Sequence, residues 1–335
     1  MEKKNRIPLF ILGSAPFLIV LAMCLSILYG AKNISMETVW DAVLHYDASN
    51  VDHAIIMTSS LPRAAGALIV GAFLAISGAI MQGMTRNYLA SPSIMGVSDG
   101  SAFVITVCMV FFSGMSSVQM ILFSMLGSLL GAGIVFGTGS LIRGGLSPVR
   151  LAIIGTIIGT FLSSLSAVIA TYFQVSQNAS FWYNARIHQI DPDILKWAIP
   201  IGLAGFLLAL SISKSITILS LGEEMSISLG QRTKFVRAAA ILTVVILTGT
   251  AVALVGKIGF VGLIIPHITR FLAGLDYKWI IPCSGVLGGV FLALCDVLSR
   301  FVNYPFETPI GVITSLIGVP FFLYLIRKKG GRDHA

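Results

Sequence analysis

The chain has 335 residues, of which 56% are hydrophobic and only 11% are Asp, Glu, Lys or Arg. A mean hydropathy of +0.92 leaves no room for a soluble domain of appreciable size. The formal net charge of +8 does not indicate a nucleic-acid partner, because the basic residues are scattered and lack the interleaved aromatic side chains of a nucleic-acid groove. The composition predicts an all-α membrane protein, a single polytopic domain over residues 1–335.

Ten apolar segments approach or reach the roughly 20 residues that a bilayer-spanning helix needs. The first follows basic residues, as a secretion signal does. Its apolar run is too long for a signal, however, and no suitable cleavage site follows, so we expect a retained first span. The segments cover residues 7–29, 61–82, 102–112, 118–138, 149–173, 194–211, 238–255, 258–272, 280–298 and 308–326.

The basic residues predict the orientation of these spans, because cytoplasmic segments of membrane proteins are enriched in Lys and Arg. With ten spans and both termini in the cytoplasm, the longer outer loops fall at about 30–60 and 174–193. Only six of the 22 Lys and Arg residues then lie in outside segments, namely Lys32, Arg63, Arg186, Lys196, Lys257 and Arg300.

Small residues four positions apart predict where the helices pack, since membrane helices associate through close backbone approach. The fifth segment differs, because a hydroxyl stripe runs beside its small stripe. The hydroxyl groups either line a pathway or bond back to carbonyls of their own helix, and both interpretations stay open. The ladder of the second segment is Ala67, Gly71, Ala75, Ala79 and Gly83, and the stripes of the fifth are Gly155, Gly159 and Ser163 beside Thr156, Thr160 and Ser164.

The eighth segment is short and contains Pro266, which predicts an interruption near the working part of a transporter. Ionisable side chains are nearly absent from the helix centres. Asp296 and Arg300 fall near the outer end of the ninth segment, and His267 near the inner end of the eighth. Ion-driven carriers usually need an intramembrane carboxylate or His relay, so we expect the driving energy to come from elsewhere.

No sequence pattern predicts a bound cofactor, metal or catalytic centre in this chain. The four cysteines lack paired spacing, and no His, Cys or carboxylate cluster has metal-ligand spacing. A phosphate-binding loop needs Gly-Lys followed by Ser or Thr, whereas Gly256-Lys257 is followed by Ile258. If ATP drives the protein, a separate subunit must therefore bind the ATP and its magnesium.

The connection at 213–237 is the longest one predicted in the cytoplasm. Glu223 and Glu224 suit the first turn of a short helix, and Gly230 suits its end. Apolar residues such as Met225 and Leu229 remain within it. It is either a solvated surface helix or a docking helix for another protein.

Four blocks in register with these spans resemble a known family. They are 61–98 (Leu-Pro-Arg to Ile-Met-Gly-Val-Ser), 222–230 (Gly-Glu-Glu to Leu-Gly), 259–267 (Gly-Phe-Val-Gly-Leu-Ile-Ile-Pro-His) and 307–322 (Glu-Thr-Pro-Ile-Gly to Gly-Val-Pro-Phe-Phe). The sequence resembles the FecCD/BtuC family over essentially its whole length. These proteins are permease subunits of ATP-driven importers for iron–siderophore complexes, haem and cobalamin.

The resemblance implies a BtuC-like type II ABC importer permease with ten helices. Such a permease pairs with a second one, of the same or a related chain, over a pair of ATP-binding subunits, and a substrate-binding protein docks outside. It implies binding-protein docking at Arg63 and Arg300, although Ser60 stands where relatives often have a further arginine. The residues that match the ATPase-coupling loop are Gly222, Glu223, Glu224, Leu229 and Gly230.

In the family, the helix that matches the fifth segment lines the pathway at the dimer interface. The resemblance therefore assigns Thr156, Thr160 and Ser164 to the pathway and the approach at Leu146, Ser147, Pro148 and Val149 to the inner gate. Hydroxyl residues can occur in relatives where Pro148 and Val149 stand. Two other departures are Tyr88, in place of a usual proline, and the stretch 181–188.

We expect a multi-pass permease of a bacterial cell membrane that imports an iron(III)–siderophore complex, of hydroxamate type, by alternating access. Cobalamin and haem are the alternative cargoes. An ion-coupled secondary carrier is a second hypothesis and would have to transport without any ATPase. A membrane-embedded enzyme would need a convergent acid–base or metal cluster, which the sequence does not indicate.

Overall fold

The computed structural model describes residues 6–29, 34–112, 114–142, 147–177, 179–180, 187, 190–304 and 306–330. Leu146 and most of 181–188, named above, lie outside this part of the chain. The helices are α1 (Arg6–Leu28), α2 (Met36–Leu44), α3 (Val51–Ile55), the π-helix η2 (Ile56–Ser60), α4 (Leu61–Thr85), α5 (Val97–Phe111), α6 (Ser117–Leu141), α7 (Pro148–Tyr172), α9 (Pro192–Ser220), α10 (Glu223–Ser228), α11 (Thr233–Val255), α12 (Val261–Ala273), α13 (Tyr277–Phe301) and α14 (Ile310–Gly330).

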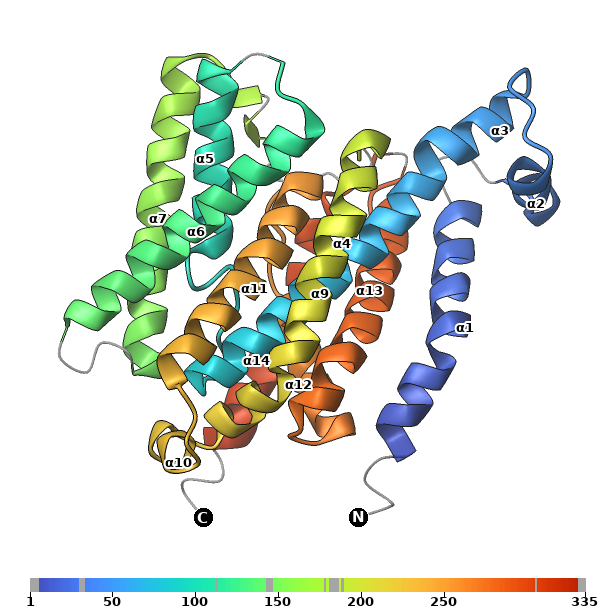
Figure 1. The fold of residues 1–335 in the computed structure, drawn as a ribbon. Coiled ribbons are helices and arrows are strands. Elements are labelled where there is room, and N and C mark those ends of the chain that lie inside the picture. Colours follow the sequence, from blue (N-terminus) through green and yellow to red (C-terminus); the bar gives the residue numbers. More distant parts are fainter. Residues whose placement is uncertain are drawn as a thin grey trace.

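Helix α4 is the centre of the bundle and packs against α1, α9, α11, α12 and α13 (Figure 1). Its small-residue ladder makes this possible. A side chain at Gly71 would overlap the backbone of Gly288 on α13, and one at Gly83 would overlap the side chains of Ile216 on α9 and Tyr277 on α13. Ala75 and Ala79, between these two glycines, are fully buried. The predicted role of this ladder in helix packing is confirmed.

Helices α5, α6 and α7 form a second group on one side of the molecule, and α1 lies on the opposite side (Figure 1). Backbone contacts between small residues join α5 and α6, since Gly127 and Gly131 of α6 lie against Gly100 of α5 and its N-cap Gly96. Helix α7 packs against α5 and α6. Its outer face is a row of exposed apolar side chains, among them Ile153, Ile157, Phe161 and Val168.

Within the described residues, ten apolar helical stretches coincide in order with the ten predicted segments. Seven are long and apolar enough to cross a membrane, and three are shorter, at Val97–Phe111, Val261–Ala273 and Ile310–Leu325. One of the seven joins α3, η2 and α4 into Val51–Thr85. That all ten cross the bilayer stays a prediction. The start of α1, the end of α14 and helix α10 lie at the same end of the bundle, opposite α2 and α3 (Figure 1).

Two predicted boundaries were wrong. Helix α9 continues to Ser220, so the connection expected at 213–237 is confined to 221–232. The polar residues that suggested an earlier end fit the helix, because Ser213 and Thr217 bond to carbonyls of their own turn while Ile216 and Leu219 are buried. Helix α5 begins at Val97, before the predicted residue 102.

The expected break at Pro266 was also wrong, because α12 continues through this proline. A proline has no backbone N–H and leaves the carbonyl four residues earlier without its helical partner. The amide of Gln82 on α4 donates to that carbonyl of Gly262, and to that of Leu263, at 3.3 Å each. The irregular backbone precedes α12 instead, where Gly256 and Phe260 have φ angles of 79° and 68°.

Candidate functional site

A cavity of about 500 Å³ lies between α5, α7 and the connection from α11 to α12. Small side chains and hydroxyl groups make up most of its wall. Two charged side chains, those of Asp99 and Lys257, are the exception among the described residues that line it. The lining residues are Ser93, Ile94, Asp99, Thr156, Gly159, Thr160, Ser163, Ser164, Ala167 and Lys257.

Asp99 lies in the first turn of α5, and its residue is only 4% exposed. Its Oδ1 accepts a hydrogen bond from the Ser163 hydroxyl at 2.9 Å and pairs with the Lys257 ammonium. Its Oδ2 lies against Gly159, where a Cβ would come within 2.5 Å of it. A glycine is therefore required at position 159 for the carboxylate to lie this close to α7.

Lys257 belongs to the irregular connection that joins α11 to α12. The Ser93 hydroxyl donates to the carbonyl of Ile258 at 3.2 Å and ties this connection to the segment before α5. The Lys257 side chain is 30% exposed, whereas that of Asp99 is 5% exposed. The ammonium is thus the more accessible charge of the pair. The Asp99–Lys257 pair thus joins α5 to the connection before α12, from the two halves of the chain.

The two stripes of α7 have the environments expected from their offset. Gly155 and Gly159 are buried, while Thr156, Thr160 and Ser164 are exposed along the cavity. Thr156 also bonds to the carbonyl of Ala152 at 2.9 Å, so the alternative of a bond within the helix holds for this residue. The Thr156 side chain therefore lines the cavity and also bonds to its own helix.

The predicted gate residues lie away from this cavity, at the first turn of α7. Ser147 is the N-cap, Pro148 occupies the first turn, and Val149 is 69% exposed. Neither Ser147 nor Val149 is among the described residues that line the cavity. Their role as a gate stays a prediction.

Asp99 is a buried ionisable residue that the sequence did not single out. This residue falls in the first turn of α5, which the hydropathy signal missed because Ser98, Asp99 and Ser101 are polar. One signal was available in the sequence. The third apolar segment is short for a span, and a carboxylate lies next to it. Within the described residues, no three His, Cys, Asp or Glu side chains are grouped as around a metal ion.

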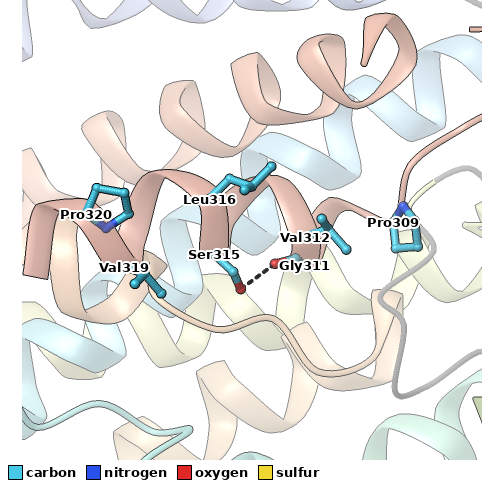
Figure 2. Close-up of a pocket in the computed structure, with 7 residues that line it drawn as sticks. All are labelled: Pro309, Gly311, Val312, Ser315, Leu316, Val319 and Pro320. Atoms are coloured by element: carbon cyan, nitrogen blue, oxygen red, sulfur yellow. Dashed lines mark hydrogen bonds between the residues drawn. The ribbon is translucent and has the colours of Figure 1, made fainter. Parts of the chain in front are cut away.

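A second hollow, of about 540 Å³, runs along one face of α14 (Figure 2). Figure 2 shows Val312, Leu316 and Val319 following one another along the helix. The hydroxyl of Ser315 bonds to the carbonyl of Gly311 at 2.7 Å. The face is therefore weakly polar. Pro309 and Pro320 delimit it.

The predicted short helix in the cytoplasmic connection is confirmed as α10. Gly222 is its N-cap with a φ of 133°, which favours glycine. Glu223 and Glu224 form its first turn, and Gly230 follows its end with a φ of 75°. Exposed apolar side chains surround it, namely Leu221, Met225, Ile227, Leu229 and Phe235. An exposed apolar cluster of this kind is typical of a protein-interaction site.

Polar contacts fix α10 to both neighbouring helices. The Ser226 hydroxyl bonds to the side chain of Gln231, whose amide donates to the carbonyl of Ser215 on α9 at 3.0 Å. The Glu223 carboxylate pairs with Arg237 on α11 at 2.9 Å. Helix α10 is therefore bonded to both α9 and α11.

Arg63 and Arg300, at the other end of the bundle, form a buried network with Asp296. The Arg63 guanidinium donates to both carboxylate oxygens of Asp296, at 2.9–3.1 Å, and to Glu307 at 2.7 Å. Arg300 pairs with the same Asp296 carboxylate. It also donates to the hydroxyl of Ser26 on α1 at 3.0 Å and to the carbonyl of Tyr29, which follows α1, at 2.8 Å.

This arrangement bears on the docking role expected for the two arginines. Arg63 is 8% and Arg300 7% exposed. The Glu307 side chain is the most accessible member of the network, at 27%. The sequence placed Asp296 and Arg300 near the end of a span but gave no sign of the link to Arg63. The docking role stays a prediction.

Comparisons with known proteins place these features in a family. A model of the FecCD transport family matches residues 18–328. The chain is 60% identical to the iron-uptake system permease protein FeuB of Bacillus subtilis, over 97% of each chain. It is 51% identical to the iron(3+)-hydroxamate import system permease protein FhuB of Bacillus subtilis, over 93% of this chain and 81% of that protein. A solved metal-chelate type ABC transporter in an inward-facing conformation matches with a TM-score of 0.79 and 30% identity, over 96% and 99% of the two chains.

Proposed function

Because the chain belongs to the FecCD transport family, we propose that it is the permease subunit of a binding-protein-dependent ABC importer for iron(III)–siderophore complexes. The observation that carries this proposal is the near full-length similarity to two Bacillus permeases named for iron uptake and iron–hydroxamate import. The hydroxamate class of siderophore is favoured by the second of them. Haem and cobalamin are the alternative cargoes within the same class of importer.

The chain is an integral membrane protein of the cell membrane, and we place it in the bacterial cytoplasmic membrane. Its ten apolar helices are proposed to be ten spans with both termini inside. That orientation agrees with the position of the start of α1 and the end of α14 at the same end as α10 (Figure 1) and with the bias of basic residues. The functional unit comprises two permeases, two ATP-binding subunits that carry ATP and magnesium, and an outer binding protein.

Helix α10 is the proposed contact with the ATP-binding subunit. Gly222, Glu223, Glu224, Leu229 and Gly230 match the family's coupling loop, and the exposed apolar side chains supply a docking surface. Through the Glu223–Arg237 pair, a movement of α10 reaches α11. Helix α11 ends at Val255, two residues before Lys257 in the cavity wall. ATP binding on the partner subunit is thus proposed to move α10, and α11 carries this movement to the cavity wall.

The pathway is proposed to run between two permeases. The exposed faces of α7 and α14 are mostly apolar with scattered hydroxyl groups, which suits a bulky chelate that must pass without being held tightly. Thr156, Thr160 and Ser164 line this path near the middle of α7, and Ser147, Pro148 and Val149 narrow it at the inner end. Alternating access then results when α7 and α14 of the two subunits move relative to each other.

Arg63 and Arg300 are proposed to accept carboxylates of the binding protein, because a planar guanidinium suits a carboxylate partner. Arg63 is already bonded to Glu307. A docking carboxylate would have to displace Glu307, which is the accessible member of the network, while Asp296 holds the guanidinium in place.

Growth of a strain that lacks this permease, on single iron sources, tests the proposal. Restored growth on ferric hydroxamates by a plasmid-borne copy, together with co-purification of an ATP-binding subunit, is expected. If the plasmid-borne copy restores growth only when haem is the iron source, the cargo is haem. If it restores cobalamin uptake and has no effect on iron uptake, the cargo is cobalamin. Solute accumulation by the purified chain under an ion gradient alone would favour a secondary carrier.

A further inference from the structure

We propose that Lys257 is a substrate-contacting residue that favours anionic ferric chelates over cationic ones as they pass the middle of the permease. The inference rests on the proposed function and concerns its selectivity. Nothing in the family blocks or in the predicted pathway pointed to this residue. It comes from the position of one ion pair in the wall of the cavity between α5 and α7.

The Asp99 carboxylate is compensated from three directions. The Ser163 hydroxyl donates to it, the Lys257 ammonium pairs with it, and it lies in the first turn of α5, where the helix dipole stabilises negative charge. Asp99 is also almost fully buried. Its charge is therefore compensated by protein groups, Lys257 included, and its burial shields it from the cavity.

The Lys257 ammonium is in the opposite situation. Its side chain is more exposed than that of Asp99 by a wide margin, 30% against 5%. An ammonium has three donors, and the Asp99 contact uses one. The remaining donors, together with those of Thr160 and Ser164 on the adjacent face of α7, are available to oxygen atoms in the cavity. The ammonium end of the ion pair is therefore the end that a solute meets in the cavity.

The position of the pair determines how strongly the Lys257 ammonium acts on a passing solute. Gly159 and Ser163, which flank the pair, lie near the middle of α7, a helix long enough to cross a bilayer. At that depth charges are poorly screened, so one ammonium discriminates between solutes of different charge more strongly than at a wet surface. Ferric chelates are suitable solutes because their metal-binding oxygens and pendant groups present both acceptors and net charge.

The test uses the complete importer in proteoliposomes and a linear ferric trihydroxamate whose terminal amine is left free, acetylated or succinylated. These three probes share one ferric core and carry a cationic, neutral or anionic tail. Uptake of each is divided by the occupancy of the binding protein measured separately. The readout is the ratio of succinylated to free-amine uptake, which does not depend on how much permease is folded.

Relative to wild type, Lys257→Gln is expected to lower this ratio about tenfold, the effect of losing one charged hydrogen bond. Lys257→Arg retains the charge and should leave the ratio close to wild type. Asp99→Asn removes the competing carboxylate and should raise it. The double variant Asp99→Asn/Lys257→Gln keeps polar side chains of similar shape without either charge. Its ratio should lie between those of Lys257→Gln and wild type, because it lacks the unpaired carboxylate that Lys257→Gln leaves.

The inference would be overturned if the uptake ratio were the same in all four variants and the uptake of all three probes fell by the same factor. That result would show that the ion pair is only structural. The failure of the proposed function looks different. In that case the wild-type importer takes up none of the three ferric probes although the binding protein, ATP-binding subunit and ATP are present.

Discussion

The carboxylate of Asp296 on α13 and the guanidinium of Arg63 on α4 are joined by three hydrogen bonds of 2.9–3.1 Å. Both side chains are buried, and Arg300 binds the same carboxylate from the next turn of α13. Helices α4 and α13 are also joined by glycine contacts further along. The buried carboxylate thus holds two arginines and the ends of two central helices in one arrangement.

Asp296→Asn is expected to destabilise the protein by about 3–5 kcal/mol, because breaking a buried ion pair leaves uncompensated charge. Thermal unfolding of the detergent-solubilised permease measures the effect. Asp193→Asn is the matched control, since Asp193 forms an exposed pair with Lys196, and exposed pairs contribute about 0–1 kcal/mol. Equal melting temperatures for the two variants would contradict the structural role of Asp296.

Glu307→Gln is expected to strengthen docking of the binding protein by roughly threefold to tenfold, because it weakens the hold of this side chain on Arg63. Surface-immobilised permease in nanodiscs allows the dissociation constant to be measured. Arg63→Glu with Arg300→Glu should abolish both docking and uptake. Glu37→Gln, a change of an exposed charge on α2, is the control, and an identical affinity for Glu307→Gln and Glu37→Gln would remove Glu307 from the docking site.

Replacing Glu223 and Glu224 with lysine is expected to uncouple ATP hydrolysis from the binding protein. The first change also places a cation beside Arg237. A charge exchange sharpens the test. Glu223→Arg and Arg237→Glu should each reduce stimulated hydrolysis, and together they should restore most of it, as measured in nanodiscs with the partner subunits. Normal coupled turnover in the double-lysine variant would refute the assignment of α10.

Gly159→Ala is expected to lower both stability, by about 1–3 kcal/mol for an overpacked contact, and chelate uptake. The added methyl would lie 2.5 Å from Oδ2 of Asp99 and would displace the carboxylate from its contact with Ser163. Gly133→Ala on α6 has nothing within 4 Å and is the control. Melting temperature and uptake are measured side by side, and a wild-type result for Gly159→Ala would show that Asp99 is not confined by α7.

The features that sequence predicted well depend on residues close together in the chain. The α4 ladder is visible from its spacing, and α10 from Gly222, the following glutamates and Gly230. The family resemblance then supplied the assignment of the cytoplasmic connection, which hydropathy alone left open between a surface helix and a docking helix.

The features that sequence missed depend on partners far apart in the chain. Asp99 is polar in isolation, and only its contact with Lys257, 158 residues away, makes it compatible with a buried position. The Pro266 break was predicted wrongly for the same reason, because the group that compensates the proline is Gln82 on another helix. Arg63 looks like a helix-end arginine until Asp296 is placed beside it.

Reconstitution of this permease in liposomes, with and without its ATP-binding subunit, tests the central claim most directly. With the ATP-binding subunit, the binding protein and internal ATP and magnesium present, a radiolabelled ferric hydroxamate is expected to accumulate against its gradient. The permease alone, under any proton or sodium gradient, is expected to accumulate none. Uphill accumulation by the permease alone would contradict a transport cycle powered by a partner that binds α10.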